Sequence, residues 1–247
     1  RHQMQFTDDT ADAVRDADVI LIAVGTPPKE NGEADTRYVE EAAREVAEGL
    51  EPGRTYTLVV KSTVPIGSNR RVAHVVTKVL AQRNADAEVH FASNPEFLRE
   101  GYALYDTFYP DRIVIGTESE TALRTLKEFY HPILEQSFAP PTCIPAPETR
   151  QKPPLVTTDP TSAEMIKYAS NAFLATKISF ANEIAGLCER VGADVVEVTR
   201  GMGLDSRIGP RFLGAGLGWG GSCFPKDTAA LISLAAEYGY AMPITQA

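Results

Sequence analysis

The chain has 247 residues, and 43% of them are apolar, so it can bury a substantial core as one large domain or two small ones. A net charge of −9 with no run of Lys or Arg argues against nucleic acid or anionic lipid as the main partner, and no apolar run approaches the roughly 18 residues of a membrane span. Three cysteines without CxxC or Cys/His metal-site spacing fit thiols outside disulfides, in a cytoplasmic protein with no metal centre.

The first 135 residues alternate apolar strands with amphipathic helices. The run VILIAV (19–24) is short, continuous and rich in Val and Ile, as expected for a strand buried on both faces. Further strands are predicted at 55–63, 89–95 and 112–116, and helices at 38–50, 68–82 and 119–130. Strands separated by helices of this length pair in parallel through right-handed crossovers. Residues 1–135 therefore predict an α/β domain with a Rossmann-like, doubly wound parallel sheet.

Residues 136–160 break this alternation. Six prolines fall between positions 140 and 154. Proline lacks a backbone donor and interrupts helices and central strands. We predict an irregular, partly extended connector between two domains, without regular structure.

Residues 161–247 predict an all-helical domain. A helix is expected at 161–190, where Thr161 followed by Glu164 forms a capping box and Gly192 follows the end. Its length indicates the spine of the domain. Shorter helices are expected at 194–200 and 228–238.

Polar and small residues follow three predicted strands, in VGTPP (24–28), KSTVP (61–65) and NPEFLREG (94–101). Ligands of α/β proteins bind at the carboxyl ends of parallel strands. In the third segment Glu96 and Glu100 lie four residues apart, which puts them on one face of a helix. The same segments also fit loops without a ligand, because Gly, Pro, Ser and Thr are common in turns and acids are favoured at helix starts.

Lys167 and Asn171 lie four residues apart on the long predicted helix. A lysine ammonium can stabilise an alkoxide, and an asparagine amide can donate to the same oxygen. On spacing alone, a lysine with a polar neighbour on a solvent-facing surface is the better interpretation.

The segment GWGGSCFPKD (218–227) places Cys223 after exposed backbone and before Lys226 and Asp227. Asp227 is expected to cap a helix that begins at Thr228. A helix N-terminus and a lysine both favour a thiolate, and the thiolate is the form that attacks carbonyl groups. A small buried cysteine beside a capping aspartate is the alternative, although a glycine-dense loop makes a poor core.

These segments together resemble the UDP-glucose/GDP-mannose dehydrogenase family. The resemblance is carried by VGTPP, KSTVPIG, NPEFLREGYALYD, PDRIVIG, SAEMIKYASNAFLATKISFANEIA and RIGPRFLGAGLGWGGSCFPKD, and it covers nearly the whole chain outside the proline-rich connector. Within the family, SCFPKD matches the UDP-glucose 6-dehydrogenase branch. The resemblance implies a partial NAD-binding Rossmann-like domain over 1–135 and a central domain over 161–247 that forms a homodimer.

The family's reaction, by resemblance, is a four-electron oxidation of UDP-glucose to UDP-glucuronate with NAD. Cys223 would be the nucleophile, which forms a thiohemiacetal and then a thioester. Lys167 and Asn171 would stabilise oxyanions, and Asp227 would position water and Lys167. Glu96 would be the general acid/base of thioester hydrolysis, and Thr63 would belong to the hydrogen-bond network around the water.

Binding residues also follow from the resemblance. The cofactor side comprises Val24, Gly25, Thr26, Pro27, Ser62, Thr63, Glu100 and Lys226. The UDP-sugar side comprises Glu96, Phe97, Leu98, Lys167, Asn171, Arg207, Phe212, Leu213, Gly216, Gly218, Gly220 and Cys223. Arg207 matches a family arginine that reaches the substrate of a neighbouring subunit.

The chain departs from the family's pattern at both ends. The family begins with a strand and a GxGxxG turn, and these 247 residues contain no GxGxxG. The family also has a third domain after the central one. We therefore expect a piece of a longer protein that is weakly active or inactive alone. A related nucleotide-sugar dehydrogenase acting on GDP-mannose or UDP-N-acetylmannosamine, and a non-catalytic fragment that binds sugar nucleotides, are the alternatives.

Overall fold

The computed structural model describes residues 4–247, which form two compact units. The first unit comprises the residues up to Thr26 together with Asp35–Lys167. The second comprises Pro27–Ala34 and Tyr168–Ala247.

The first unit is built on a five-stranded sheet with the strand order β1-β2-β3-β4-β5. The strands are β1 (Val19–Ile22), β2 (Thr55–Val60), β3 (Glu88–Ser93), β4 (Ile113–Gly116) and β5 (Leu155–Thr158). The pairs β1/β2, β2/β3 and β4/β5 are parallel. The predicted Rossmann-like sheet is confirmed, and it differs from an all-parallel one at β3/β4, where Ser93 and Gly116 form an antiparallel pair.

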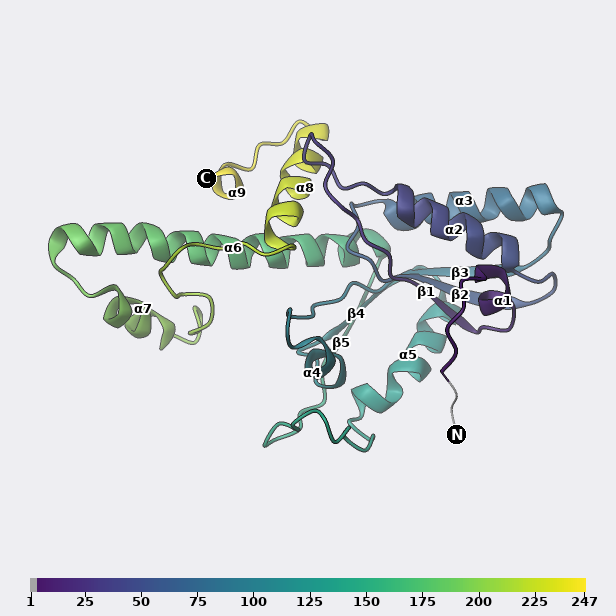
Figure 1. The fold of residues 1–247 in the computed structure, drawn as a ribbon, viewed down its shortest axis with the longest axis horizontal. Coiled ribbons are helices and arrows are strands. Elements are labelled where there is room, and N and C mark those ends of the chain that lie inside the picture. The colour runs from purple at the N-terminus through teal and green to yellow at the C-terminus, as the bar shows by residue number, and fades with distance from the viewer. Residues whose placement is uncertain (1–3) are drawn as a thin grey trace. The chain divides into compact units, whose positions relative to one another are not determined.

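Helices cover both faces of this sheet, as expected for a doubly wound fold. Figure 1 shows α2 (Arg37–Gly49) and α3 (Ser68–Arg83) on one face and α5 (Glu120–Leu134) on the other. Each face has its own apolar core, one around Tyr56 and Leu58 and the other around Ile115 and Leu126. Two short helices lie outside the predicted elements: α1 (Thr10–Arg15) precedes the first predicted strand, and α4 (Ala103–Phe108) lies between the strands predicted at 89–95 and 112–116.

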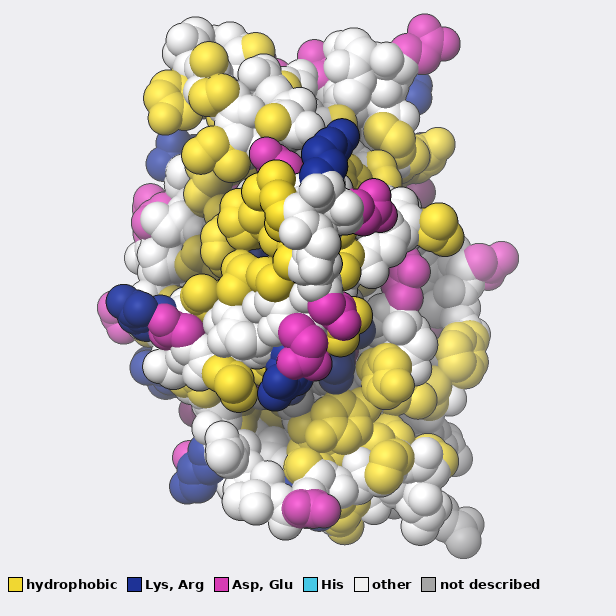
Figure 2. Space-filling model, turned by 90° about the vertical axis from the view of Figure 1, so that its left-hand side faces the viewer, with side chains coloured by type: hydrophobic (Ala, Val, Ile, Leu, Met, Phe, Trp, Pro, Cys, Tyr) yellow, Lys and Arg dark blue, Asp and Glu magenta, His cyan; other side chains and the backbone are white. Residues whose placement is uncertain are grey.

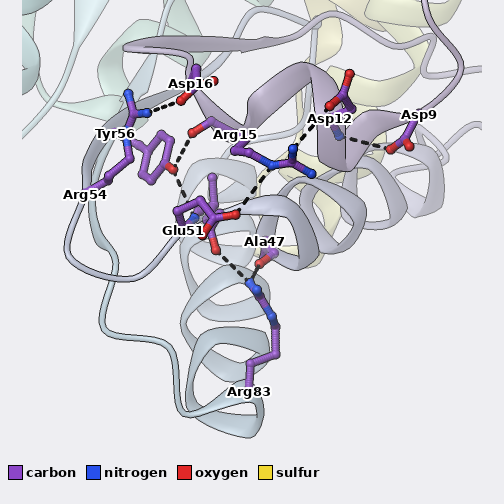
Figure 3. A network of polar contacts seen from close by, with 10 residues as sticks. Asp9, Asp12, Arg15, Asp16, Ala47, Glu51, Arg54, Tyr56 and Arg83 are labelled. Carbon is purple, nitrogen blue, oxygen red and sulfur yellow. Dashed lines mark hydrogen bonds and ion pairs between the residues drawn. The ribbon is translucent and has the colours of Figure 1, made fainter.

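A network of polar contacts surrounds the amino end of β2 (Figure 3). The fully buried Tyr56 donates its hydroxyl hydrogen to the carbonyl of Arg15 at 2.9 Å and accepts from the backbone N–H of Glu51 at 3.0 Å. The Arg54 guanidinium lies 5.6 Å from the ring centre of Tyr56 and donates to Asp16 at 2.5 Å. The network therefore joins β2 to the end of α1 and the end of α2.

The strand β5 corrects the prediction for the connector. Residues 136–160 were expected to lack regular structure, but Leu155–Thr158 pairs in parallel with β4, beginning with Ile113 opposite Leu155. The strand directly follows Pro153 and Pro154, where proline is tolerated because the strand has not yet begun. The density of prolines hid a short β-branched segment.

The second unit is helical. Its elements are the later part of α6 (Pro160–Val191), then α7 (Val195–Gly203), α8 (Phe224–Glu237) and α9 (Pro243–Gln246). A small core joins α6 to α8 through Tyr168, Ala172, Ala230 and Leu231. Within residues 4–247, no helix is long and apolar enough to cross a membrane.

Two predicted helix caps are wrong. Helix α8 begins at Phe224 with Pro225 in its first turn, so Cys223 occupies the N-cap and Asp227 lies inside the first turn. At the start of α6, Asp159 accepts from the Ser162 backbone N–H at 2.9 Å, and Glu164 does not form a capping box with Thr161. Both helices begin earlier than predicted because proline is well suited to a first helical turn.

Candidate active site

The loops after β1 and β2 are joined by two side-chain hydroxyls of the first unit. Thr26 Oγ1 donates to the carbonyl of Thr63 at 2.7 Å, and Ser62 Oγ donates to the carbonyl of Val24 at 2.7 Å. Between them, a Cβ added at Gly25 would meet no atom within 4 Å, so bare backbone lies open at this edge of the sheet. The predicted cofactor-side residues of both loops are thus brought together.

Two predicted catalytic residues meet in the same unit. Lys167 Nζ lies 2.9 Å from Glu96 Oε1, and the lysine side chain is 5% exposed. The other carboxylate oxygen of Glu96 accepts from the backbone N–H of Leu98 at 2.6 Å. Burial raises the pKa of Glu96, but Lys167, the Leu98 N–H and Lys61 together hold it below its ordinary value. Glu96 is therefore a carboxylate with a buried ammonium beside it.

The aromatic ring of Phe97 has two cations beside it. The Arg112 guanidinium is 3.8 Å from the ring centre, and Lys167 Nζ is 5.4 Å from it. Cation–π contacts of this kind fix the direction of a side chain as well as contributing energy. Leu98 and Glu100 follow on the same loop and are exposed.

Lys61 belongs to this cluster but was not predicted as a site residue. Its Nζ donates to the carbonyl of Asn94 at 3.3 Å, two residues before Glu96. Burial lowers the pKa of Lys61 to about 8, against the attraction of Glu96 and together with the repulsion of Lys167. The available signal was a lysine directly after the buried run TYTLVV, at the carboxyl end of a parallel strand.

In the second unit, Asp227 connects two predicted residues. It is 1% exposed and accepts from Asn171 Nδ2 at 2.6 Å and from Lys226 Nζ at 2.5 Å, one donor on each oxygen. Asn171 and Asp227, separated by more than fifty residues in sequence, are thus brought together. Lys226 was predicted on the cofactor side, and here its ammonium is paired with Asp227.

Cys223 occupies the N-cap of α8 and is half-buried. Its Sγ lies 3.6 Å from Ser222 Oγ. The next side chain, Phe224, has its ring centre 6.2 Å from that of Phe212 and 6.4 Å from that of Trp219. Cys223 is therefore the residue at which the glycine-rich loop ends and α8 begins, directly before a ring that lies close to two aromatic rings of that loop.

The glycine-rich loop is attached to α6 at two points. The backbone N–H of Gly216 donates to Asn182 Oδ1 at 2.9 Å, and Trp219 Nε1 donates to Ser179 Oγ at 2.8 Å. Gly218 has a φ of 99°, which a residue with a side chain rarely adopts. These attachments hold exposed backbone, including Gly218 and Gly220, in a defined path beside α6.

The remaining predicted residues differ in exposure. Phe212 has a φ of 63°, an uncommon conformation for a non-glycine residue, and it precedes the buried Leu213. Arg207 is exposed and forms a two-point ion pair with Asp205 in its own loop. Pro27 belongs to the segment Pro27–Ala34 of the second unit, apart from its predicted neighbours Val24–Thr26.

This arrangement combines a Rossmann-like sheet with polar groups suited to redox chemistry at an alcohol. The first unit presents a buried Lys–Glu pair and, after β1, open backbone at the carboxyl end of the sheet, and the second presents a thiol and a buried Asn–Asp pair. In the part of the chain that is described, no cluster of His, Cys, Asp or Glu could hold a metal ion. The fold and these groups define the class of Rossmann-like dehydrogenases.

The comparisons identify the family. The NAD binding domain of the UDP-glucose/GDP-mannose dehydrogenase family matches residues 1–134, and the central domain of that family matches residues 161–247. The chain belongs to the UDP-glucose/GDP-mannose dehydrogenase family.

Similar proteins cover nearly all of the chain. It is 50% identical over 219 residues to UDP-glucose 6-dehydrogenase YwqF of Bacillus subtilis, which covers 89% of this chain and 44% of that protein. A solved UDP-glucose dehydrogenase of the archaeon Pyrobaculum islandicum is 44% identical with a TM-score of 0.85, over 98% of this chain and 51% of that one. A GDP-mannose dehydrogenase structure from Pseudomonas aeruginosa is 33% identical with a TM-score of 0.69, over 97% and 52%. The chain spans about half the length of these relatives.

Proposed function

We propose that this chain carries the catalytic residues of an NAD-dependent UDP-glucose 6-dehydrogenase. The reaction is the oxidation of the sugar C6 alcohol to a carboxylate, which yields UDP-glucuronate and two NADH. The observation that supports this most is the buried Lys167–Glu96 pair, since an ammonium held against a carboxylate in a Rossmann-like unit suits both alkoxide stabilisation and proton transfer. The greater identity to UDP-glucose dehydrogenases than to GDP-mannose dehydrogenase favours UDP-glucose.

The residues that would hold the cofactor fit a nicotinamide dinucleotide at the carboxyl ends of β1 and β2. Gly25 leaves backbone uncovered there, and Thr26 and Ser62 fix the two loops to each other. When bound, NAD accepts the hydride in each oxidation. Val24–Pro27, Ser62, Thr63 and Glu100 form the proposed contacts, with Lys226 acting through Asp227.

In the first oxidation, C6 loses a hydride, its hydroxyl proton passes to water, and an aldehyde results. The ammonium of Lys167 stabilises the negative charge that develops on the C6 oxygen, and the amide of Asn171 donates to the same oxygen. The pairing of Lys167 with Glu96 and of Asn171 with Asp227 fixes both side chains before substrate binds. Preorganised donors of this kind need little rearrangement during reaction.

In the second oxidation, Cys223 Sγ forms a bond to the aldehyde carbon as the C=O π bond breaks, and the thiol proton passes to the carbonyl oxygen, which becomes the hydroxyl of a thiohemiacetal. Loss of a second hydride and of that hydroxyl proton leaves a thioester. Cys223 occupies the N-cap of α8, the end at which the helix carries partial positive charge and can stabilise the oxyanion that forms beside the sulfur. The covalent bond keeps the aldehyde from leaving between the two oxidations.

Hydrolysis completes the reaction. Water adds to the thioester carbon and gives one proton to Glu96, the C–S bond breaks, and the second proton of the water passes to the departing sulfur, so that a thiol and the carboxylate product result. Glu96 is ionised at neutral pH and can therefore accept this proton, although its lowered pKa makes it a weaker base than a free carboxylate. Thr63 contributes to the hydrogen-bond network around the water.

The sugar nucleotide is proposed to bind along the loop that precedes α8. Its side of the site comprises Phe97, Leu98, Arg207, Phe212, Leu213, Gly216, Gly218 and Gly220. Uncovered glycine backbone and the half-buried ring of Phe212 suit hydrogen bonding and stacking of a nucleotide sugar. Arg207 is exposed, and its guanidinium pairs with Asp205 of its own loop, so it lies where it can reach a second subunit.

A homodimer is part of the proposal. Phe173, Phe180 and Leu187 follow each other at seven-residue intervals on α6 and are 65%, 46% and 55% exposed. A seven-residue apolar repeat on a long helix suits pairing with a second copy about a two-fold axis. Figure 2 shows hydrophobic side chains gathered on the side of the molecule where α7 and the carboxyl end of α6 lie. The sparse cysteines agree with a reducing, cytoplasmic location.

The direct test is an assay of the protein expressed from the complete reading frame that contains this chain. With NAD and UDP-glucose it should form two NADH per sugar consumed, and GDP-mannose should be turned over at least tenfold more slowly. The 247-residue chain alone should be weakly active or inactive. No NADH from the complete protein, or faster turnover of GDP-mannose, would contradict the proposed function.

A further inference from the structure

Glu164 is a buried acid that does not form the predicted capping box and has no role in the proposed reaction. It lies on α6, three residues before Lys167, and is 3% exposed. Its Oε2 accepts from the backbone N–H of Gly67 at 2.6 Å, and its Oε1 accepts from the backbone N–H of Asn69 at 2.8 Å. The hydroxyl of Ser93 lies 3.5 Å from Oε1. All of these residues belong to the first unit.

These contacts make Glu164 the cap of another helix. Helix α3 begins after Gly67, which has a φ of 87° and no side chain to accept from the first N–H groups of the helix. Unpaired N–H groups at a buried helix start are costly, and negative charge is favoured there. The carboxylate of Glu164 supplies both acceptors from a segment nearly a hundred residues away. Burial raises the pKa of Glu164, while the two N–H groups oppose that rise.

A second contact fixes the same part of α6. A Cβ added at Gly116, the last residue of β4, would lie 2.5 Å from Ala163 Cβ and 2.9 Å from Pro160 Cα. The first turn of α6 therefore rests directly on the end of β4, where only glycine fits. Together with the carboxylate of Glu164, this contact holds the start of α6 against the sheet at two points.

We propose that Glu164 is a positioning residue that sets the geometry of the Lys167–Glu96 pair. Glu164 and its hydrogen-bonding partners lie on segments that carry candidate catalytic residues. Gly67 follows Thr63 by four residues, and Ser93 precedes Glu96 by three. Glu164 itself precedes Lys167 by less than one helical turn. One carboxylate thus joins the loop after β2, the end of β3 and the start of α6. The expected effects on kcat rest on the proposed function, whereas the structural role of Glu164 does not.

The chemistry of the contact requires two acceptor oxygens. Both backbone partners are N–H donors, and the Ser93 hydroxyl can donate as well. A glutamine at position 164 would present an NH2 group to one of those donors and lose that hydrogen bond. An aspartate would keep both oxygens on a shorter side chain, so it should retain part of the contact.

The kinetic test compares Glu164→Gln, Glu164→Asp and the control Glu189→Gln, an exposed position on the same helix, in the protein from the complete reading frame. A displaced catalytic group commonly costs about 10²-fold in rate. We expect kcat of Glu164→Gln to fall roughly 10- to 100-fold, with KM for NAD changed less than threefold, and Glu164→Asp to recover part of kcat. Ser93→Ala removes one donor to Glu164 and introduces no mismatched polar group, so it should lower kcat less than Glu164→Gln does.

A second measurement does not depend on activity. Amide hydrogen exchange in Glu164→Gln should accelerate at least tenfold at Gly67 or Asn69 and also at Leu98, whose N–H is held by Glu96. Amides of α5 should be unchanged. The positioning role is overturned if Leu98 exchanges as in the unmodified protein, or if kcat falls only in proportion to the folded fraction. If the unmodified protein does not oxidise UDP-glucose, the proposed function fails, and the exchange at Leu98 still decides whether Glu164 positions Glu96.

Discussion

Replacing Lys61 by methionine should make the protein more stable near neutral pH. Lys61 lies at the end of β2, and burial is the largest cause of its lowered pKa, which falls from the ordinary 10.5 to about 8. Below pH 8 the folded protein holds a charged ammonium in a place that disfavours charge. Methionine has a similar unbranched shape and needs no such hydration.

The size and the pH window of the effect follow from that pKa. Between pH 8 and 10.5 the unfolded chain binds more protons at Lys61 than the folded chain does, so the contribution of Lys61 to stability rises with pH across this window. The full cost, present below pH 8, corresponds to about 3 kcal/mol. Lys61→Met should therefore raise Tm by roughly 5–10 °C at pH 7.

The assay is thermal unfolding of the unmodified chain, Lys61→Met and the control Lys78→Met at several pH values from 7 to about 10.5. Lys78 is exposed on α3, so its replacement should change Tm little at any pH. The stability difference for Lys61→Met should shrink steadily above pH 8. A difference that is independent of pH, or a Lys61→Met variant less stable than the unmodified chain at pH 7, would refute the reasoning. A lysine that lowers stability is retained more readily in a site that uses its charge.

Two further predictions concern a buried phenol and a buried ammonium. Tyr56→Phe removes the hydroxyl that bonds the Arg15 carbonyl and the Glu51 N–H, so chemical denaturation should show a free energy of unfolding lower by about 1–3 kcal/mol. The control Tyr38→Phe, at a half-exposed position, should change it very little. Equal losses in the two variants would show that this network does not stabilise the fold. Lys167→Ala should lower kcat by about 10²–10⁴ with a modest change in the affinity for NAD, and an unchanged kcat in steady-state assays would exclude Lys167 from the oxidation.

The elements that the sequence predicted well are those that depend on local pattern. The run at 19–24 is continuously apolar and the helix at 161–190 is long and has clear start and end signals, and both are present with ends shifted by one or two residues. Strand β5 was missed because its four residues, although mostly β-branched, are too few to predict a strand beside so many prolines, and they form one by pairing with β4. Short segments stabilised by partners far away in sequence cannot be read from local composition.

The polar residues likewise divide into those predicted from local sequence and those whose role depends on distant partners. Glu164 matched a capping box by spacing, yet its carboxylate caps α3 instead, since only the folded chain shows that the start of α3 lacks a side-chain cap. The Lys167–Glu96 and Asn171–Asp227 pairs involve residues predicted individually, but their pairing depends on the fold. Lys61 was missed because a single lysine in sequence usually indicates a solvent-exposed side chain.

The central claim is that the sulfur of Cys223 bonds to the oxidised C6 carbon of the sugar. The most direct measurement is mass spectrometry of the complete protein, quenched with acid during turnover of UDP-glucose and NAD and then digested. The account predicts a sugar-nucleotide adduct on the peptide that contains Cys223, absent in Cys223→Ser, which should also fail to form two NADH per sugar. A Cys223→Ser variant that forms two NADH per sugar at the normal rate, with no adduct in either protein, would contradict it.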